Sequence, residues 1–261
     1  MNKPLVFNKM CALGNDFVVI DERKKPRNWQ VRQVQQICHR RFGIGADQLL
    51  LIRKSGKADA SMHIYNQDGS KAKQCGNGLR AVASLLLMEN NSPEVCIEVG
   101  GFAHRCRLIA HDWVEVAFPL PMVNKSHKAF AKNLGFDQAL EVDVGNPHLV
   151  LFRSQNTALK DFETLGKTLQ AQYAGGINVH ALKQLSKDRI YLDHWERGTG
   201  VTPSCGSGSI ASVYAGVSLG LLKPKVIVEN AIGNLTVECT PGEVLLSGVV
   251  KLIFNGQIEV A

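Results

Sequence analysis

Two apolar runs with helical spacing each follow directly on a polar, glycine-rich stretch that contains a cysteine. In each run apolar residues recur at i, i+3, i+4 and i+7, which predicts one face of a helix. These residues are Leu79, Val82, Ala83 and Leu86 after Cys75, and Ile210, Val213, Tyr214 and Val217 after Cys205. Glycine and small polar residues fill both preceding stretches, so the chain can turn sharply there and leave backbone N–H groups open at the helix start.

Shorter apolar runs predict strands in both halves of the chain. The predicted strands are 17–21, 49–53, 61–65, 95–99, 104–109 and 113–118, then 140–144, 149–152, 190–195, 226–228, 235–239, 244–246, 250–254 and 257–260. Residues 28–41 and 158–173 are predicted to be helices. Residues 10–16 are interpreted as the segment that leads into the first strand, and 42–48 as a glycine-rich loop.

The two halves of the sequence repeat at a nearly constant distance. Cys75 and Cys205, Asn66 and Glu196, and Gln48 and Asn178 are each 130 residues apart, and Asn15 and Asn146 are 131 apart. Four pairs at one offset indicate a duplication, which gives two similar α/β halves with a pseudo-twofold relation. Equivalent loops of two such halves can face each other across a cleft, so that two thiols would approach a substrate from opposite sides.

Composition limits the class of protein. A chain of 261 residues that is 45% hydrophobic supports one or two domains with real cores. No apolar stretch approaches the length of a membrane span, and the first residues lack a secretory signal, so we expect a cytoplasmic protein with no membrane partner. The net charge is +7, but Lys and Arg are scattered and no aromatic stacking motif accompanies them. We therefore expect no nucleic-acid partner; a basic surface suits a small anionic substrate.

Cysteine is the residue type that points to chemistry. The seven cysteines are spread out and contain no C-x-x-C pair, which is neither a disulfide framework nor a zinc pattern, and no metal site is predicted. Only Cys75 and Cys205 lie at glycine-rich helix starts. The helix macrodipole and the open N–H groups there favour the thiolate, so we expect both thiols to ionise readily.

Three chemistries suit such a pair. In acid–base chemistry, one thiolate removes a proton from carbon and the other thiol returns one on the opposite face, which inverts a stereocentre. In nucleophilic catalysis, a cysteine needs a neighbouring histidine, and His148 next to Asn146 is a candidate, although this leaves the second cysteine unexplained. In a redox reaction, the two thiols would form a disulfide. The duplicated context favours acid–base chemistry.

Seven motifs, in this order along the chain, resemble the diaminopimelate epimerase family, whose cofactor-independent enzymes interconvert LL- and meso-diaminopimelate. They are Leu13-Gly14-Asn15-Asp16-Phe17, Arg41-Phe42-Gly43-Ile44-Gly45-Ala46-Asp47-Gln48, Cys75-Gly76-Asn77-Gly78-Leu79-Arg80, Val144-Gly145-Asn146-Pro147-His148, Gly176-Ile177-Asn178-Val179, Glu196-Arg197-Gly198 and Cys205-Gly206-Ser207-Gly208. The resemblance covers nearly the whole chain. It implies an isomerase of lysine biosynthesis that needs no cofactor and acts on a small-molecule amino-acid substrate. A homodimer is an open alternative to a monomer.

The resemblance also implies a fold and a set of site residues. The fold is two pseudo-symmetric α/β halves, 1–118 and 119–249, each a mixed or antiparallel sheet wrapped around a central helix that starts at a cysteine, with the last strand, 250–261, returning to the first half. Pro119-Leu120-Pro121 is the predicted boundary between them. The two bases are Cys75 and Cys205, and the backbone N–H groups of Gly76, Asn77, Gly206 and Ser207 hold the reacting carboxylate. The remaining substrate-contact positions are Asn15, Gln48, Asn66, Asn146, Asn178, Glu196 and Arg197.

Some positions depart from the family pattern. The family usually has His-Gly at Cys11-Ala12, acidic residues at Lys71 and Lys73, Glu at Val201 and Thr at Ser207. These changes leave two alternatives open: a racemase of another amino acid on the same scaffold, and a non-catalytic amino-acid-binding protein.

Overall fold

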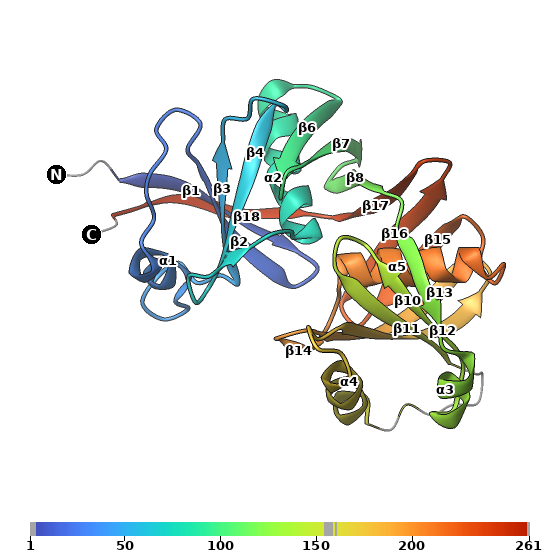
Figure 1. The fold of residues 1–261 in the computed structure, drawn as a ribbon. Coiled ribbons are helices and arrows are strands. Elements are labelled where there is room, and N and C mark those ends of the chain that lie inside the picture. Colours follow the sequence, from blue (N-terminus) through green and yellow to red (C-terminus); the bar gives the residue numbers. More distant parts are fainter. Residues whose placement is uncertain (1–3, 154–158, 160, 260–261) are drawn as a thin grey trace. The chain divides into compact units, whose positions relative to one another are not determined.

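The computed structural model describes residues 4–153, 159 and 161–259. The chain divides into two compact units (Figure 1). Unit 1 comprises Met1–Val116 and Gly248–Ala261, and unit 2 comprises Ala117–Ser247. Each unit has its own set of strands and its own buried helix.

Unit 1 is a mixed sheet with helices on both faces. Its elements are β1 (Leu5–Ala12), β2 (Asn15–Asp21), α1 (Val31–Cys38), β3 (Gln48–Arg53), β4 (Ala60–Asn66), β5 (Lys71–Ala72), α2 (Gly76–Asn90), β6 (Glu94–Val99), β7 (Phe102–Ala110), most of β8 (Trp113–Pro119) and β18 (Lys251–Ile258). β2 with β3 and β4 with β6 are parallel pairs, whereas β1 pairs antiparallel with β2 and with β18. The end of the chain therefore forms the strand beside its beginning.

Unit 2 repeats this order of elements. They are β9 (Met122–Ser126), α3 (Lys128–Asn133), β10 (Phe136–Asp143), β11 (Pro147–Arg153), α4 (Phe162–Ala171), β12 (Asn178–Ser186), β13 (Arg189–Glu196), β14 (Gly200–Thr202), α5 (Gly206–Ser218), β15 (Lys225–Asn230), β16 (Gly233–Thr240) and most of β17 (Glu243–Val249). The parallel pairs are β11 with β12 and β13 with β15, which correspond to β2 with β3 and β4 with β6. The predicted fold class, duplicated α/β halves, is confirmed.

Each sheet buries a helix on each face because side chains alternate across a strand. In unit 1, Leu49 and Leu51 of β3 belong to the core cluster that contains Val34 and Ile37 of α1. Leu50, between them, lies against Gly78 of α2 on the other face. α2 is buried along most of its length, so its position is fixed by apolar packing on several strands.

β1 and β2 form a hairpin that the sequence pattern did not predict. Residues 10–16, interpreted as the segment that leads into the first strand, are themselves mostly strand residues, because Met10–Ala12 belong to β1 and Asn15–Asp16 to β2, and Cys11 pairs with Asp16 across the hairpin. Only Leu13 and Gly14 form the turn, with φ of 49° and 74°. Two consecutive positive φ angles are those of a tight hairpin turn whose twist matches the strands.

Other predicted boundaries were also wrong. The first helix covers only Val31–Cys38 rather than 28–41, and the helix predicted at 158–173 is α4, Phe162–Ala171, with part of its predicted start outside the described residues. β9, α3 and β12 were missed. The runs at 250–254 and 257–260 form one strand, β18, and Val260 lies outside the described residues.

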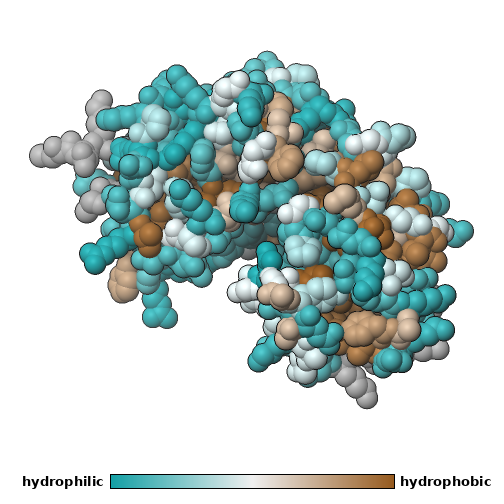
Figure 2. Space-filling view, viewed as in Figure 1, coloured by the Kyte–Doolittle hydropathy of each residue, from teal (hydrophilic) through white to brown (hydrophobic). Residues whose placement is uncertain are grey.

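Hydrophilic residues cover most of the face of unit 1 that is seen in the space-filling view, and hydrophobic residues appear between them (Figure 2). Within the part of the chain that the structure describes, no helix has the length and apolar character needed to cross a membrane.

Candidate active site

Cys75 and Cys205 occupy the same position in their helices. Each is the N-cap residue in extended conformation, with φ of −152° for Cys75 and −138° for Cys205. Each Sγ accepts a hydrogen bond from the backbone N–H three residues later, Gly78 at 3.3 Å and Gly208 at 3.4 Å. Sulfur thus takes the role that a serine or asparagine oxygen usually has at an N-cap.

The first two N–H groups of both helices stay available. The first N–H groups of a helix have no partner within it. Among the described residues, no protein acceptor reaches the N–H groups of Gly76 and Asn77 in α2, or those of Gly206 and Ser207 in α5. Two adjacent amides beside a thiol form a site for a carboxylate, because the N–H groups and the helix dipole both favour negative charge.

Asn15 is the predicted substrate residue that the structure brings to Cys75. Its Oδ1 lies 3.8 Å from Cys75 Sγ and 3.5 Å from Nδ2 of Asn77. Its Nδ2 donates to Asp47 Oδ2 at 2.9 Å. Because a carboxylate only accepts, this bond fixes the amide of Asn15 with its oxygen toward the thiol.

An ionic network holds Asp47 and therefore Asn15. Arg40 bonds both Asp47 and Asp16, and Lys9 donates to Asp16 at 2.6 Å and to the carbonyl of Gly45. Burial alone would raise the pKa of Asp16, but hydrogen bonds from Arg40 and Lys9 outweigh it and lower that pKa to about 2. Asp16 is therefore ionised at neutral pH, and the network that supports Asn15 is charged.

Gln48 and Asn66 form a second polar pair in unit 1. They are opposite each other on β3 and β4, and Gln48 Nε2 donates to Asn66 Oδ1 at 3.0 Å. Asn66 Nδ2 donates to Ser70 Oγ at 3.0 Å. The buried Oε1 of Gln48 has no partner among the described residues, which leaves an acceptor for a ligand.

Arg80 is a buried cation on the helix that begins at Cys75. Its side chain is fully buried, and Nη2 donates to Asn77 Oδ1 at 2.6 Å. Nε and Nη1 have no partner among the described residues. Burial lowers the pKa of Arg80 to about 10, and the charge of Cys75 acts in the opposite direction. This attraction is mutual, so Arg80 favours the thiolate of Cys75.

Cys205 has the opposite electrostatic environment. Its thiol is buried beside the carboxyl of Glu196, which also accepts a hydrogen bond from Thr202 Oγ1 at 2.6 Å. Burial and the charge of Glu196 raise the pKa of Cys205 well above its ordinary value, against hydrogen bonds from Ser207 and the Gly208 amide. The expectation that the helix start makes both thiols ionise readily was wrong for Cys205, because loss of solvation and a neighbouring carboxylate outweigh the helix end.

Asn178 and Arg197 form a polar corner in unit 2. Asn178 Oδ1 accepts from the backbone N–H of Arg197 at 3.0 Å, and its Nδ2 donates to the carbonyl of Pro147 at 2.9 Å. The exposed guanidinium of Arg197 donates to the carbonyl of Gly175 at 2.9 Å. A guanidinium has five donors, so Arg197 can still bind a carboxylate.

His148 is not placed to serve as the base of a nucleophilic cysteine. It is fully buried, Nε2 lies 3.0 Å from Asn146 Oδ1, and Nδ1 lies 2.8 Å from His180 Nε2. Burial, with the charges of His194 and Arg197, lowers the pKa of His148 to about 3. Both ring nitrogens are occupied by partners other than Cys205, so the interpretation as Cys–His–Asn catalysis is excluded.

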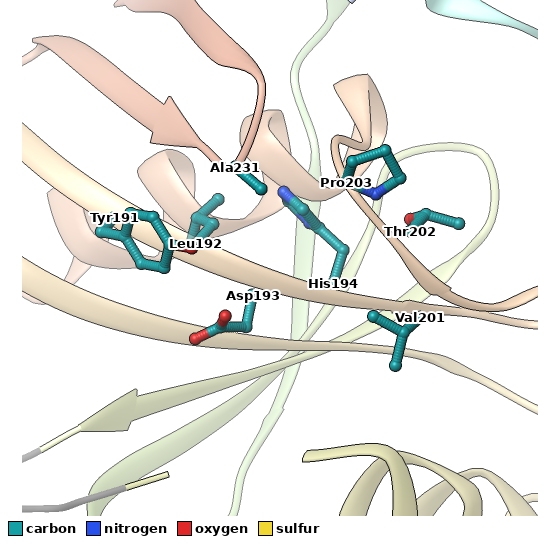
Figure 3. Close-up of a pocket in the computed structure, with 8 residues that line it drawn as sticks. All are labelled: Tyr191, Leu192, Asp193, His194, Val201, Thr202, Pro203 and Ala231. Carbon is teal, nitrogen blue, oxygen red and sulfur yellow. The ribbon is translucent and has the colours of Figure 1, made fainter. Parts of the chain in front are cut away.

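A pocket of about 300 Å³ opens beside β13 and β14 (Figure 3). Its lining residues are Tyr191, Leu192, Asp193, His194, Val201, Thr202, Pro203 and Ala231. None of them is a predicted substrate-contact residue, although Thr202 also bonds Glu196. Among the described residues, no group of three or more His, Cys, Asp or Glu side chains could hold a metal ion.

Comparison with known proteins decides the family. The diaminopimelate epimerase family model matches residues 7–101 and 140–252. Diaminopimelate epimerase from Sphingopyxis alaskensis is 33% identical over 262 residues, which is 97% of this chain and 97% of that protein. The enzyme of the same name from Rhodospirillum centenum is 35% identical over 270 residues, covering 97% and 92%. The chain belongs to the diaminopimelate epimerase family.

Solved structures show that the family's fold is shared more widely. A phenazine biosynthesis protein of the PhzF family from Bacillus anthracis has a TM-score of 0.72 at 13% identity, covering 99% of this chain and 100% of that one. A hydroxyproline epimerase from Agrobacterium vitis, solved with trans-4-hydroxy-L-proline, has a TM-score of 0.67 at 13% identity, covering 98% and 93%. At these identities the likeness concerns the fold alone.

The departures from the diaminopimelate epimerase pattern fall on two kinds of position. Cys11 and Ala12 pair with Asp16 and Asn15 across the β1–β2 hairpin, so they border the network that orients Asn15. Lys71, Lys73 and Val201 are exposed. None of these changes removes a bond of the two cysteines described above.

Several residues that the structure places at the site have no role predicted from the sequence. They are Asp47, Arg80 and Thr202, together with His180 and His194 behind Asn146. One signal was readable. At the offset of 130 residues that relates the halves, Arg80 corresponds to Ile210, and a charge at a position where the repeat has a buried aliphatic residue indicates a specific role.

Proposed function

We propose that this protein interconverts LL- and meso-diaminopimelate, a precursor of lysine, with Cys75 and Cys205 as its two bases and without a cofactor. The family supports the substrate, since its curated members carry this name. One observation supports the chemistry above the others. Two matched helix N-caps hold thiols in environments of opposite charge, a buried guanidinium near Cys75 and a buried carboxyl beside Cys205.

The proton balance of the reaction uses this difference. In the favoured form of the enzyme, Cys75 is a thiolate and Cys205 is a thiol. In the direction that starts from this form, the Cys75 thiolate takes the proton from the α-carbon, and the electron pair of the broken C–H bond is delocalised into the α-carboxylate. The Cys205 thiol gives its proton to the opposite face of the same carbon. The products are the inverted stereocentre, a Cys75 thiol and a Cys205 thiolate. The reverse reaction begins from that second form.

The remaining groups have roles that fit their chemistry. The open amides of α2 and α5 would bind the α-carboxylate and stabilise the charge that develops on it. Arg197 would bind the distal carboxylate. Asn15, Gln48, Asn66, Asn146, Asn178 and Glu196 would fix the amino groups and the carboxylate oxygens.

Exchange with solvent tests the proposal directly. Reduced protein is incubated with LL-diaminopimelate in D₂O, and deuterium at the α-carbon and the meso product are both followed. We expect the wild type to exchange and epimerise, and Cys75→Ser and Cys205→Ser each to lose epimerisation. Exchange and inversion of another amino acid, but not of diaminopimelate, would retain the chemistry and reject the substrate. Ligand binding without any exchange would indicate a non-catalytic binding protein.

A further inference from the structure

Three buried histidines form an unbroken hydrogen-bonded row across the sheet of unit 2. His148 Nδ1 lies 2.8 Å from His180 Nε2, and His180 Nδ1 lies 2.9 Å from His194 Nδ1. The row ends on an amide at each side: His148 Nε2 is 3.0 Å from the Asn146 amide, and His194 Nε2 is 2.7 Å from Asn230 Oδ1. The three rings are at most 1% exposed.

Unit 1 shows that the fold does not need this row. The pairings His148–Asn178, Val150–His180 and His180–His194 correspond to Phe17–Gln48, Val19–Leu50 and Leu50–Ile64. The three histidines therefore match Phe17, Leu50 and Ile64, which are buried and apolar. A buried polar chain is stabilising only when every member is satisfied, and apolar residues in its place serve the fold at least as well. The histidines therefore need an explanation outside packing.

The number of ring hydrogens determines which nitrogen donates and which accepts in each hydrogen bond of the row. Asn230 Nδ2 donates to the carbonyls of Val228 at 3.1 Å and Gly233 at 3.3 Å, so its Oδ1 faces His194 as an acceptor. His194 must then carry its hydrogen on Nε2. Burial lowers the pKa of all three histidines, to about 4 for His194, so each ring is neutral and has one hydrogen.

The donor of each hydrogen bond determines the donor of the next, from His194 to Asn146. His194 Nδ1 accepts, so His180 donates through Nδ1, and His148 in turn donates through Nδ1 to His180 Nε2. His148 Nε2 is then a bare acceptor, and only the Nδ2 of Asn146 can satisfy it. An amide has the same shape after a half turn, so Asn146 takes that orientation without other movement. Its Oδ1 then points away from His148, and the residue is partly exposed.

We propose that the row of His148, His180 and His194, anchored by Asn230, is a positioning device that presents Asn146 to the substrate as a hydrogen-bond acceptor, and so selects an ammonium group over a carboxylate there. The proposal rests on the proposed function for the identity of the ligand. The matched residue in unit 1 supports it. Asn15, 131 residues earlier, has its amide fixed by Asp47. Position 177 of unit 2, which corresponds to Asp47, is Ile177, so another partner must fix Asn146.

Nitrogen NMR tests the row in the wild-type protein, whatever the protein turns over. Long-range proton–nitrogen correlation of the histidine rings at pH 7 should show three neutral rings, protonated at Nδ1 in His148 and His180 and at Nε2 in His194. A nitrogen–nitrogen coupling across the hydrogen bond should join Asn146 Nδ2 to His148 Nε2. A hydrogen on Nε2 of His148, or a doubly protonated ring, overturns the proposal.

One variant should reverse the orientation of the Asn146 amide, so that Nδ2 instead of Oδ1 faces the substrate. In Asn230→Asp, the carboxylate favours a fourth hydrogen in the row, so His148 gains Nε2–H and Asn146 must accept from it. Asn146 then presents Nδ2 to the ammonium. We expect KM to rise about tenfold or more, the value of one hydrogen bond to a charged group, with a smaller change in kcat. Raising the pH should remove the extra hydrogen and return KM toward the wild-type value. From outside the row, the charge of Arg197 acts on His148.

Two matched controls separate orientation from damage. Asn230→Ser has a hydroxyl that can donate or accept, and the triple variant His148→Phe, His180→Leu, His194→Ile copies the row of unit 1. Each leaves Asn146 free to take either orientation, so KM should rise only about twofold, without a change between pH 7 and 9. Equal KM values for Asn230→Asp and Asn230→Ser at every pH would refute the proposal. Should the wild type not act on diaminopimelate, the proposed function fails, and the NMR experiment still decides the row.

Discussion

Replacing Arg80 by methionine should separate activity from stability. The surroundings of Arg80 in the structure determine how the substitution changes the free energy of unfolding. Burial lowers the pKa of Arg80 from 12.5 to about 10, so the charged side chain costs about 3 kcal/mol in the folded protein at neutral pH. Methionine removes that cost. It also removes the hydrogen bond to Asn77 Oδ1, which contributes about 1.5–3 kcal/mol as a bond from a charged donor. The two nearly cancel, so urea unfolding should change by no more than about 1–2 kcal/mol.

Activity should fall in spite of that balance. Arg80 is the buried cation on the helix of Cys75, and without it the thiolate loses a favourable interaction. Two unit charges several Å apart at an effective dielectric constant of about 20 interact by about 2–3 kcal/mol, which moves a titration by about two pH units. The acid limb of the pH profile of kcat/KM for diaminopimelate should therefore move up by about two pH units, and the rate at pH 7 should fall by about tenfold or more.

Arg53→Met is the matched control. Arg53 pairs at 3.0 Å with Glu22, whose side chain is only 2% exposed, so its loss leaves a buried carboxylate without its cation. This variant should lose about 3–5 kcal/mol of stability and keep the pH profile of the wild type. The reasoning is refuted if Arg80→Met is as unstable as Arg53→Met, or if its pH profile is unchanged.

Three further predictions concern stability and thiol chemistry. Gly208→Ala should lower the urea midpoint more than Gly78→Ala, because the new Cβ would lie 2.3 Å from a buried histidine ring rather than 3.0 Å from a leucine methyl; equal midpoints would contradict this. Cys205 should react slowly with iodoacetamide at pH 7 and faster in Glu196→Gln, since burial and that carboxylate raise the thiol pKa; rapid labelling of folded wild type at pH 7 would count against it. Asp16→Asn should cost about 2 kcal/mol at pH 7, because a folded pKa near 2 stabilises the protein above the unfolded value of 3.8 and is lost as pH falls through 2; the same cost at pH 2 would disprove the assignment.

The parts of the fold that could be predicted are those where local pattern and tertiary packing agree. Both cysteine helices were found because an apolar period and a glycine-rich start coincide, and α2 and α5 begin directly after their cysteines. β1 was missed because Lys9 interrupts its apolar alternation. The structure buries Lys9 by pairing it with Asp16, a contact between adjacent strands that no periodicity records.

The sequence could predict which positions form the site, but not the hydrogen bonds, burial and neighbouring charges of their side chains. The constant offset predicted that Asn15 and Asn146 are equivalent. Asn15 is the first residue of β2, and Asn146 directly precedes β11, the equivalent strand. It could not predict how each amide is held. Asp47 reaches Asn15 through a tertiary contact, and His148, although only two residues from Asn146, is itself held by a tertiary contact with His180. The state of Cys205 was missed for the same reason. Burial of the thiol and the approach of Glu196 depend on the folded unit, whereas the helix start is visible in the sequence.

Duplication alone would give two equal thiols, and equal thiols serve inversion poorly. A single turnover needs one thiolate and one thiol, and two identical sites would hold both protons or neither over much of the pH range. The chain breaks this symmetry at matched positions. Arg80 stands where unit 2 has Ile210, and Glu196 stands where unit 1 has Asn66. A cation near one thiol and an anion near the other both favour the same form, with the proton on Cys205. Under the proposed function, the reaction from that form would begin at Cys75, and the opposite direction would first have to move a proton against this preference. The two substitutions preserve the duplicated backbone and supply the charge difference that its symmetry lacks.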